Sequence, residues 1–256
     1  MAVIVRQGIK LAYEDQGEGE PAFVFVHGWT CDRSFFAPQA AHFARWHRVV
    51  SVDLRGHGQS DKPRGLYPIA TYAEDMEYMI EQLNLGKVVA VGHSMGGIAV
   101  LQLAAAYPEH VAAIVMVDPS PFVRPPEMRM ANEAMLAALE VGNQEPRRQF
   151  IENMFLPTSD HRIVEQVLAV MLNTPDHVAI SAMRGGLEFD APTVAARCRA
   201  PALHVAATPP RNPPHLMSQW LPKVVNGWTV GAGHFNQLEV PEQVNAMIEG
   251  FLRHYL

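Results

Sequence analysis

A glycine-rich segment in the first half of the chain most strongly constrains how this sequence can fold. The run Val88 to Val91 is apolar and β-branched, which is typical of a strand buried on both faces of a sheet. It leads into Gly92-His93-Ser94-Met95-Gly96-Gly97, and a helix-like stretch follows as far as Tyr107. Such an abrupt change of direction brings backbone segments too close together for side chains, which explains the glycines. The pattern predicts a strained turn that holds the Ser94 hydroxyl away from the sheet.

Strand-like and helix-like segments alternate along much of the chain, which predicts a mostly parallel sheet with helices on both faces. The strand candidates are Val3 to Arg6, Ile9 to Tyr13, Ala22 to Val26, Val49 to Val52, Val88 to Val91, Ile114 to Val117, Ala202 to Ala206 and Val224 to Val230, of which the first two form a hairpin. The main helix candidates are Ser34 to Arg45, Tyr72 to Leu83, Met95 to Tyr107 and Pro241 to Tyr255. Thr71 and Glu74 predict a capping box, and Pro241 suits a first helical turn. We therefore expect a doubly wound α/β fold.

The alternation stops within residues 119–200, where four helix-like stretches follow one another. These are Glu127 to Val141, Glu145 to Phe155, His161 to Leu172 and Asp176 to Leu187. We expect an inserted all-helical lid, within one domain whose α/β core comprises residues 1–118 and 201–256. Lids exclude water and shape a substrate pocket. Its methionines suit either an adaptable apolar pocket or helix-on-helix packing, and include Met128, Met130, Met135, Met154, Met171 and Met183.

Composition and charge exclude several classes of partner. A chain of 256 residues with 48% hydrophobic content can build one sizeable core. The net charge of −6 and the scattered lysines and arginines leave no basic face for nucleic acid. No apolar run approaches the about 18 residues of a membrane span, and Met1 to Arg6 does not resemble a secretion signal, so we expect a cytoplasmic protein without a membrane partner.

Cysteine usage bears on metals and redox chemistry. Cys31 and Cys198 provide no disulfide framework, and we expect two reduced thiols. No grouping of cysteine and histidine has zinc spacing, so we expect neither a metal nor a cofactor. The sequence does not specify an oligomeric state.

Four segments of the chain resemble motifs of the α/β-hydrolase family. They are Val26-His27-Gly28-Trp29, Asp53-Leu54-Arg55-Gly56-His57-Gly58-Gln59-Ser60, the glycine-rich segment around Ser94, and Gly231-Ala232-Gly233-His234-Phe235. The resemblance spans nearly the whole chain and implies a Ser-acid-His triad, with an oxyanion hole made by two backbone N–H groups. Carried onto this sequence, it implies Ser94 as the nucleophile, His234 as the base, and Met95 and Trp29 as the oxyanion donors.

The acid of the triad is harder to assign. Most relatives place it after the strand that corresponds to Ala202 to Ala206, but the following loop, residues 207–213, contains no Asp or Glu. Asp118 directly follows the strand candidate Ile114 to Val117, where some branches of the fold place the acid, although it could also simply cap the proline turn after it. Glu188 and Asp190 are the alternatives. Asp53 and Asp32 better suit structural roles, in a turn and at a helix start.

The resemblance implies a serine hydrolase of the carboxylesterase type, which cleaves an ester, lactone or thioester of a mainly apolar or aromatic small molecule through an acyl-enzyme. Pocket candidates are Trp29, Phe122, Met154 and Phe155. Serine at position 94 argues against the haloalkane dehalogenases and epoxide hydrolases of this fold, which need aspartate there.

Two alternatives remain open. A branch of the same fold comprises cofactor-free dioxygenases of N-heteroaromatic substrates, in which a His–Asp pair abstracts a proton. The chain could also be an inactive small-molecule receptor, because fold alone does not determine chemistry.

Overall fold

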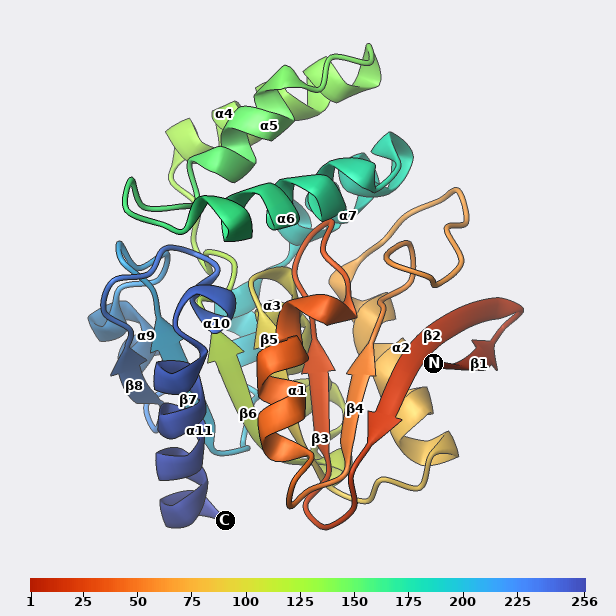
Figure 1. Cartoon of the computed structure of the whole chain (residues 1–256), viewed down its shortest axis with the longest axis vertical. Coiled ribbons are helices and arrows are strands. Elements are labelled where there is room, and N and C mark those ends of the chain that lie inside the picture. Colours follow the sequence, from red (N-terminus) through yellow and green to blue (C-terminus); the bar gives the residue numbers. More distant parts are fainter.

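The computed structural model of this protein describes residues 1–256 and centres on an eight-stranded sheet (Figure 1). The strands lie in the spatial order β1-β2-β4-β3-β5-β6-β7-β8. Only β1 with β2 and β2 with β4 pair antiparallel, and every other neighbouring pair is parallel. Their bounds are β1 Ala2–Arg6, β2 Ile9–Gln16, β3 Phe23–Val26, β4 Val49–Val52, β5 Val88–His93, β6 Val111–Val117, β7 Ala202–Ala206 and β8 Val225–Trp228. The predicted, mostly parallel sheet with its N-terminal hairpin is confirmed.

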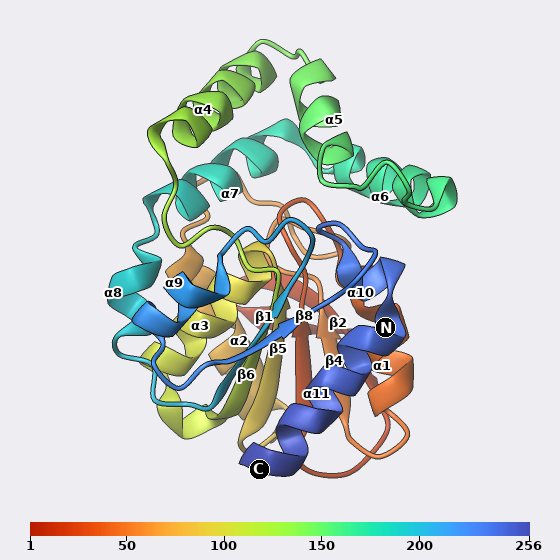
Figure 2. The same ribbon diagram turned by 90° about the vertical axis from the view of Figure 1, so that its left-hand side faces the viewer.

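Helices cover both faces of the sheet, as the alternating pattern predicts (Figure 2). One face carries α1 (Ala37–Phe43), which follows the short 3₁₀ turn η1 (Arg33–Phe36), together with α11 (Pro241–Tyr255). The other carries α2 (Ile69–Gln82), α3 (Met95–Ala106), α8 (Ala191–Ala195) and α9 (Pro214–Trp220). The remaining short elements are η2 (Pro108–His110) and α10 (Asn236–Glu239).

Alternate residues of each central strand enter different cores. Phe23 and Phe25 of β3 pack against Phe43 on the α1 face, whereas Val24 and Val26 pack on the α2 and α3 face. Since successive side chains of a strand point to opposite faces, an apolar run buried on both sides divides in this way. The two cores hold the parallel strands rigidly, and the loops at their carboxyl ends therefore have a fixed support.

Four helices between β6 and β7 lie over the carboxyl edge of the sheet, at the top of Figure 1. They are α4 (Pro126–Glu140), α5 (Glu145–Glu152), α6 (His161–Asn173) and α7 (Asp176–Glu188), and we call them the helical cover. Each lies within two or three residues of the bounds expected from the sequence. The next helix, α8, leaves the cover and packs beside α3 (Figure 2).

Two local expectations are wrong. Helix α2 begins at Ile69 with Pro68 as its N-cap residue, so Thr71 lies inside the first turn and forms no capping box. Pro68 takes the N-cap position with an extended backbone, φ −66° and ψ 150°, and no side chain caps the helix. The proline-rich stretch Pro209 to Pro214 also predicts a stiff loop after β7, but Pro214 already begins α9. Pro241 does occupy the start of α11, as expected.

None of the helices combines the length and the apolar composition that a membrane crossing requires.

Candidate active site

Ser94 lies at the junction of β5 and α3 in a strained backbone conformation, with φ 53° and ψ −116°. A Cβ atom on Gly92 would lie 2.1 Å from the carbonyl oxygen of Gly96, and one on Gly96 would lie 2.1 Å from that of Val26. The predicted close approach of backbone segments is therefore confirmed. A serine at positive φ is uncommon and is maintained only where the surrounding structure enforces it. The turn fixes Ser94 at the carboxyl edge of the sheet.

The loop after β3 lies directly against Ser94. A Cβ on Gly28 would be 3.1 Å from the Cβ of Ser94. The Gly28 carbonyl accepts hydrogen bonds from His27 Nδ1 at 2.8 Å and from the Cys31 N–H at 3.2 Å. The Gly28 carbonyl and the Trp29 N–H belong to the same peptide unit, and in a trans peptide these two groups point in opposite directions. The Trp29 N–H therefore points away from His27 Nδ1 and the Cys31 N–H. It donates to no acceptor within the protein.

A second backbone donor comes from the helix that follows the serine. Met95 is the first residue of α3, and the first N–H groups of a helix have no intrahelical acceptor. Both Trp29 and Met95 line the same cavity as Ser94. The site thus brings together the two backbone donors that the sequence indicates.

His234 and Asp118 are in direct contact although 116 residues separate them in the chain. His234 Nδ1 lies 2.6 Å from Asp118 Oδ2, and both side chains are buried. We assign the proton to Nδ1, since an ionised carboxylate can only accept. Two further bonds position the His234 loop, because its N–H donates to the Met154 carbonyl and its carbonyl accepts from His93 Nε2, both at 2.9 Å.

The pairing of strands explains how Asp118 reaches this position. β6 and β7 are parallel neighbours, with Val117 opposite Val205, so the residue after β6 lies beside the loop after β7. Asp118 Oδ1 faces the N–H groups of Ala207 and Arg211 in that loop, each at 3.4 Å. Asp118 also has positive φ, 36°, which turns its carboxylate toward His234 rather than toward its own proline turn. The neighbouring strand thus supplies a carboxylate where the β7 loop has none.

Arg211 is a site residue that the sequence reasoning missed. Its Nε lies 2.9 Å from His234 Nδ1 and 3.6 Å from Asp118 Oδ2. Nδ1 cannot donate to Asp118 and accept from Arg211 at the same time, so with Asp118 ionised the guanidinium acts through its charge. Burial raises the pKa of the Asp118 carboxyl, and Arg211 opposes that shift. The only sequence signal for Arg211 was its place in the loop that usually carries the acid.

The buried histidine of this pair resists protonation. Burial lowers the pKa of His234 well below 6.5, and the positive charge of Arg211 lowers it further. His93, which lies behind it with ring centroids 4.5 Å apart, is also buried and also has a strongly lowered pKa. Both imidazoles are therefore neutral at neutral pH.

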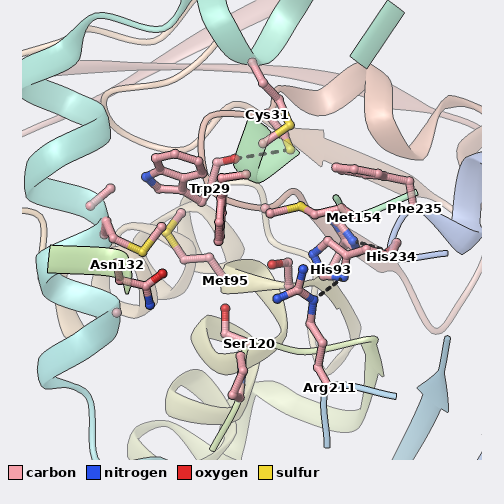
Figure 3. A pocket seen from close by; sticks show the side chains of 18 of the residues that line it. Trp29, Cys31, His93, Met95, Ser120, Asn132, Met154, Arg211, His234 and Phe235 are labelled. Atoms are coloured by element: carbon pink, nitrogen blue, oxygen red, sulfur yellow. Dashed lines mark hydrogen bonds between the residues drawn. The ribbon is translucent and has the colours of Figure 1, made fainter. Parts of the chain in front are cut away.

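Ser94 and His234 line one cavity beneath the helical cover. Figure 3 shows His234 in the wall of this cavity, beside Arg211 and His93. Trp29 and Met154 line it, as expected, but Phe122 and Phe155 do not. Phe122 stacks on Trp220 with ring centroids 5.3 Å apart, and Phe155 stacks on Phe235 at 4.9 Å. Phe122 is buried by this packing and Phe155 is partly buried, both outside the cavity. The methionines of the helical cover that line it are Met128, Met154, Met171 and Met183, whereas Met135 packs in the core and Met130 is exposed.

The other carboxylates considered from the sequence lie elsewhere. Asp190 is exposed and caps α8 through the Thr193 N–H, and Glu188 is exposed at the end of α7. Asp53 accepts hydrogen bonds from the backbone N–H groups of Arg33 and Gln59, and Asp32 caps η1. None of them contacts His234. Cys31 and Cys198 are free thiols.

Specific contacts attach the helical cover to the loop beside Ser94. The Trp29 indole donates to the carbonyl of Ala179 in α7 at 2.8 Å. The Arg147 guanidinium lies 5.5 Å from the Trp29 ring and donates to the carbonyls of Met171 and Thr174. Arg147 is fully buried, and burial lowers its pKa to about 10. The position of the helical cover is thereby fixed relative to the Trp29 backbone.

Comparison with known proteins supports the same conclusion about the fold. The model for the alpha/beta hydrolase fold family matches residues 21–165, more than half of the chain. This protein therefore belongs to the α/β-hydrolase fold family, and the resemblance noted in the sequence is confirmed.

Characterised relatives share parts of the chain. The 2-(acetamidomethylene)succinate hydrolase of Mesorhizobium japonicum is 34% identical over 136 residues, which are 53% of this chain and 47% of the relative. A non-heme chloroperoxidase of Streptomyces lividans is 37% identical over 123 residues, 46% of this chain and 44% of the relative. The chain thus matches less than half of the length of these relatives.

Solved structures match over the whole length. A thermophilic esterase from Thermogutta terrifontis superposes with a TM-score of 0.86 at 25% identity, covering 99% of this chain and 97% of the esterase. An enol-lactonase from Burkholderia xenovorans superposes with a TM-score of 0.88, covering 98% of this chain and 100% of the lactonase, and its 20% identity shows the fold alone. Together with the family match, these structures show that the chain adopts the α/β-hydrolase fold over its whole length.

Proposed function

We propose that this protein is a serine hydrolase that cleaves a carboxylic ester, or a lactone or thioester, through an acyl-enzyme. The observation that carries the proposal is the shared cavity: Ser94, held at positive φ, opens on the same space as His234, whose other ring nitrogen contacts Asp118. A nucleophile, a base and an orienting acid in that relation define acyl-transfer sites on many folds.

In the proposed reaction, the neutral His234 Nε2 accepts the Ser94 proton while Ser94 Oγ attacks the substrate carbonyl carbon. The Trp29 and Met95 N–H groups stabilise the oxyanion, because they are already oriented and no internal acceptor competes for them. The protonated His234 then donates its proton to the leaving oxygen. Water, deprotonated by His234, releases the acid product and restores Ser94. Asp118 keeps the Nδ1–H tautomer throughout and stabilises the imidazolium.

The cavity wall supports a small, mainly apolar acyl or alcohol group. Trp29, Phe150, Phe235 and the cover methionines provide apolar contacts around the serine. In this proposal the helical cover acts as a lid that excludes water from the acyl-enzyme. The esterase among the structural neighbours and the hydrolase among the sequence relatives agree with an ester or related acyl substrate.

Burst kinetics test the proposal. With p-nitrophenyl acetate, we expect one equivalent of p-nitrophenolate in a rapid phase before slower steady turnover, because the acyl-enzyme accumulates when deacylation is slower. Mass spectrometry of quenched protein should find the acetyl group on the peptide that contains Ser94. A linear time course, with no acyl adduct on that peptide under any quench condition, would contradict a covalent mechanism.

The pH dependence follows from the environment of His234. Only the neutral imidazole acts as a base, so kcat/KM falls as the pH decreases through the His234 pKa. Because burial and Arg211 lower that pKa, we expect the acidic limb of kcat/KM for a neutral ester to lie below pH 6.5. Arg211→Gln removes a positive charge that lowers the pKa of His234, so it should shift the acidic limb of kcat/KM toward higher pH. The groups facing His234 are Asp118, Arg211 and His93. A limb at or above pH 7 in the wild-type protein would contradict the lowered pKa of His234, and a limb that persists unchanged in Arg211→Gln would contradict the effect of the Arg211 charge.

A further inference from the structure

The wall of the cavity carries an arginine that the proposed reaction does not use. Arg124, in the loop before α4, and Arg211 both line the cavity. No aspartate or glutamate lines it. This is unexpected in a chain whose net charge is −6, and it makes the cavity a local positive site on an acidic protein.

The two arginines differ in what they contact. Arg211 lies opposite Asp118, so its charge is largely balanced. Arg124 forms no ion pair, and its guanidinium donates no hydrogen bond to any protein group, while its Nη2 lies against Gly186 of α7. Arg124 is half-buried beneath the helical cover. Burial lowers its pKa to about 10, and repulsion from Arg129 and Arg211 contributes, so it is still charged at neutral pH.

A second polar group in the wall also lacks a partner. The side chain of Asn132, on α4, is only 6% exposed, lines the cavity and makes no hydrogen bond within the protein. Figure 3 shows it on the side of the cavity opposite Arg211 and His234. Buried polar side chains normally have a hydrogen-bond partner, and an amide that lines a cavity without one is available to a ligand. An unpartnered amide and an unpartnered guanidinium in the same cavity point to an anionic ligand group.

We infer that the substrate carries a carboxylate, which accepts hydrogen bonds from Arg124 and Asn132 while its acyl carbonyl lies at Ser94. The inference rests on the proposed hydrolase function and adds the substrate class, an ester or lactone of an acidic small molecule. A planar guanidinium can bind a carboxylate through two parallel N–H donors, which gives orientation as well as affinity.

The test compares acidic esters with neutral esters of matched shape. One pair places the charge in the acyl part: p-nitrophenyl hemiglutarate and p-nitrophenyl 5-methylhexanoate. The other places it in the leaving group: 4-acetoxybenzoate and 4-acetoxybenzamide. After subtraction of spontaneous hydrolysis, we expect kcat/KM for the acidic member of at least one pair to exceed that of its neutral partner by on the order of tenfold or more. A charge-assisted hydrogen bond contributes about 1.5 to 3 kcal/mol, and each 1.4 kcal/mol is tenfold.

Two variants test whether the preference for acidic esters depends on Arg124 and Asn132. Arg124→Gln should lower the acid-to-neutral ratio by about tenfold or more, and Asn132→Leu should lower it severalfold. The matched control is Arg184→Gln, which removes the same charge from an exposed side chain of α7 that pairs with Glu140, and it should keep the ratio within about twofold. Circular dichroism checks that each variant is folded.

The possible failures are distinguishable. If both neutral esters are hydrolysed with acylation of Ser94 but neither acidic ester is preferred, the proposed function stands and the carboxylate site is wrong. An equal decrease of both members of a pair in Arg124→Gln would also overturn it, since that result indicates a structural role. If no ester is hydrolysed, glutarate binding by calorimetry, with glutaramide as the neutral comparison, decides the question. Equal affinity for the two would overturn the inference.

Discussion

Ser94→Ala should decrease kcat for p-nitrophenyl esters by on the order of 10⁴-fold to 10⁶-fold and abolish the rapid phase of product release. The size of the effect follows from covalent catalysis, because no acyl-enzyme can form without the Ser94 oxygen. Alanine at this position keeps the small side chain that the strained turn accepts, so the effect should lie in kcat and not in the amount of folded protein. Steady-state kinetics and a thermal unfolding curve on the same preparation measure both.

Ser120→Ala is the matched control, since Ser120 is a second hydroxyl that lines the same cavity. We expect it to retain activity within about tenfold. The comparison also separates the two enzyme classes that the sequence left open. Oxygen consumption with a quinolone-type substrate that survives Ser94→Ala but is lost in His234→Ala would replace the hydrolase with a dioxygenase, because that reaction needs only the His–Asp pair.

Asp118→Asn should decrease kcat by about 10⁴-fold at neutral pH. Asparagine is nearly isosteric with aspartate, so the cavity and the fold should be retained. In the variant, His234 Nδ1 would face the donating amide of asparagine and the Nε–H of Arg211, which already lies 2.9 Å away. Two donors favour the tautomer with a bare Nδ1, which places the remaining proton on Nε2 and leaves no base directed at Ser94. The nearby Arg211 thus makes this substitution more damaging than loss of a carboxylate alone.

Controls for the acid come from the carboxylates that the sequence left as alternatives. Glu188→Gln and Asp190→Asn alter exposed side chains without contact to His234, and both should keep kcat within about threefold, although Asp190→Asn can weaken the α8 cap slightly. Near-normal turnover in Asp118→Asn, with a large loss in either of the others, would show that the acid had been misassigned.

Much of the fold can be read directly from local patterns. The central strands β3, β4, β5 and β6 appear as apolar runs, and the helices of the cover begin and end close to their expected residues. Burial on one or two faces imposes these patterns on the sequence. The predicted Thr71 capping box does not form. Its two residues match the motif, but the helix begins at Ile69, two residues before Thr71, so Thr71 cannot be the N-cap.

Only some of the site residues could be predicted from the sequence. Ser94 and His234 could be predicted because each lies in a glycine-containing motif. Those glycines are required by the local course of the backbone, so the motif is visible within a short stretch of sequence. Asp118 could only be ranked above other carboxylates, since its position beside His234 depends on the pairing of β6 with β7 and on a positive φ. Arg211, Arg124 and Asn132 carry no motif at all.

The sequence by itself determined the sheet, the strained serine turn and the order of the three polar residues along the chain. These features depend on interactions between residues close in sequence, or on burial patterns that each segment shows alone. Only the tertiary structure decided which carboxylate meets His234, that Phe122 and Phe155 pack outside the cavity, and that an arginine and an asparagine without partners lie inside it. Those outcomes depend on distances between segments that are remote in sequence, and side-chain identity along the chain does not encode such distances directly.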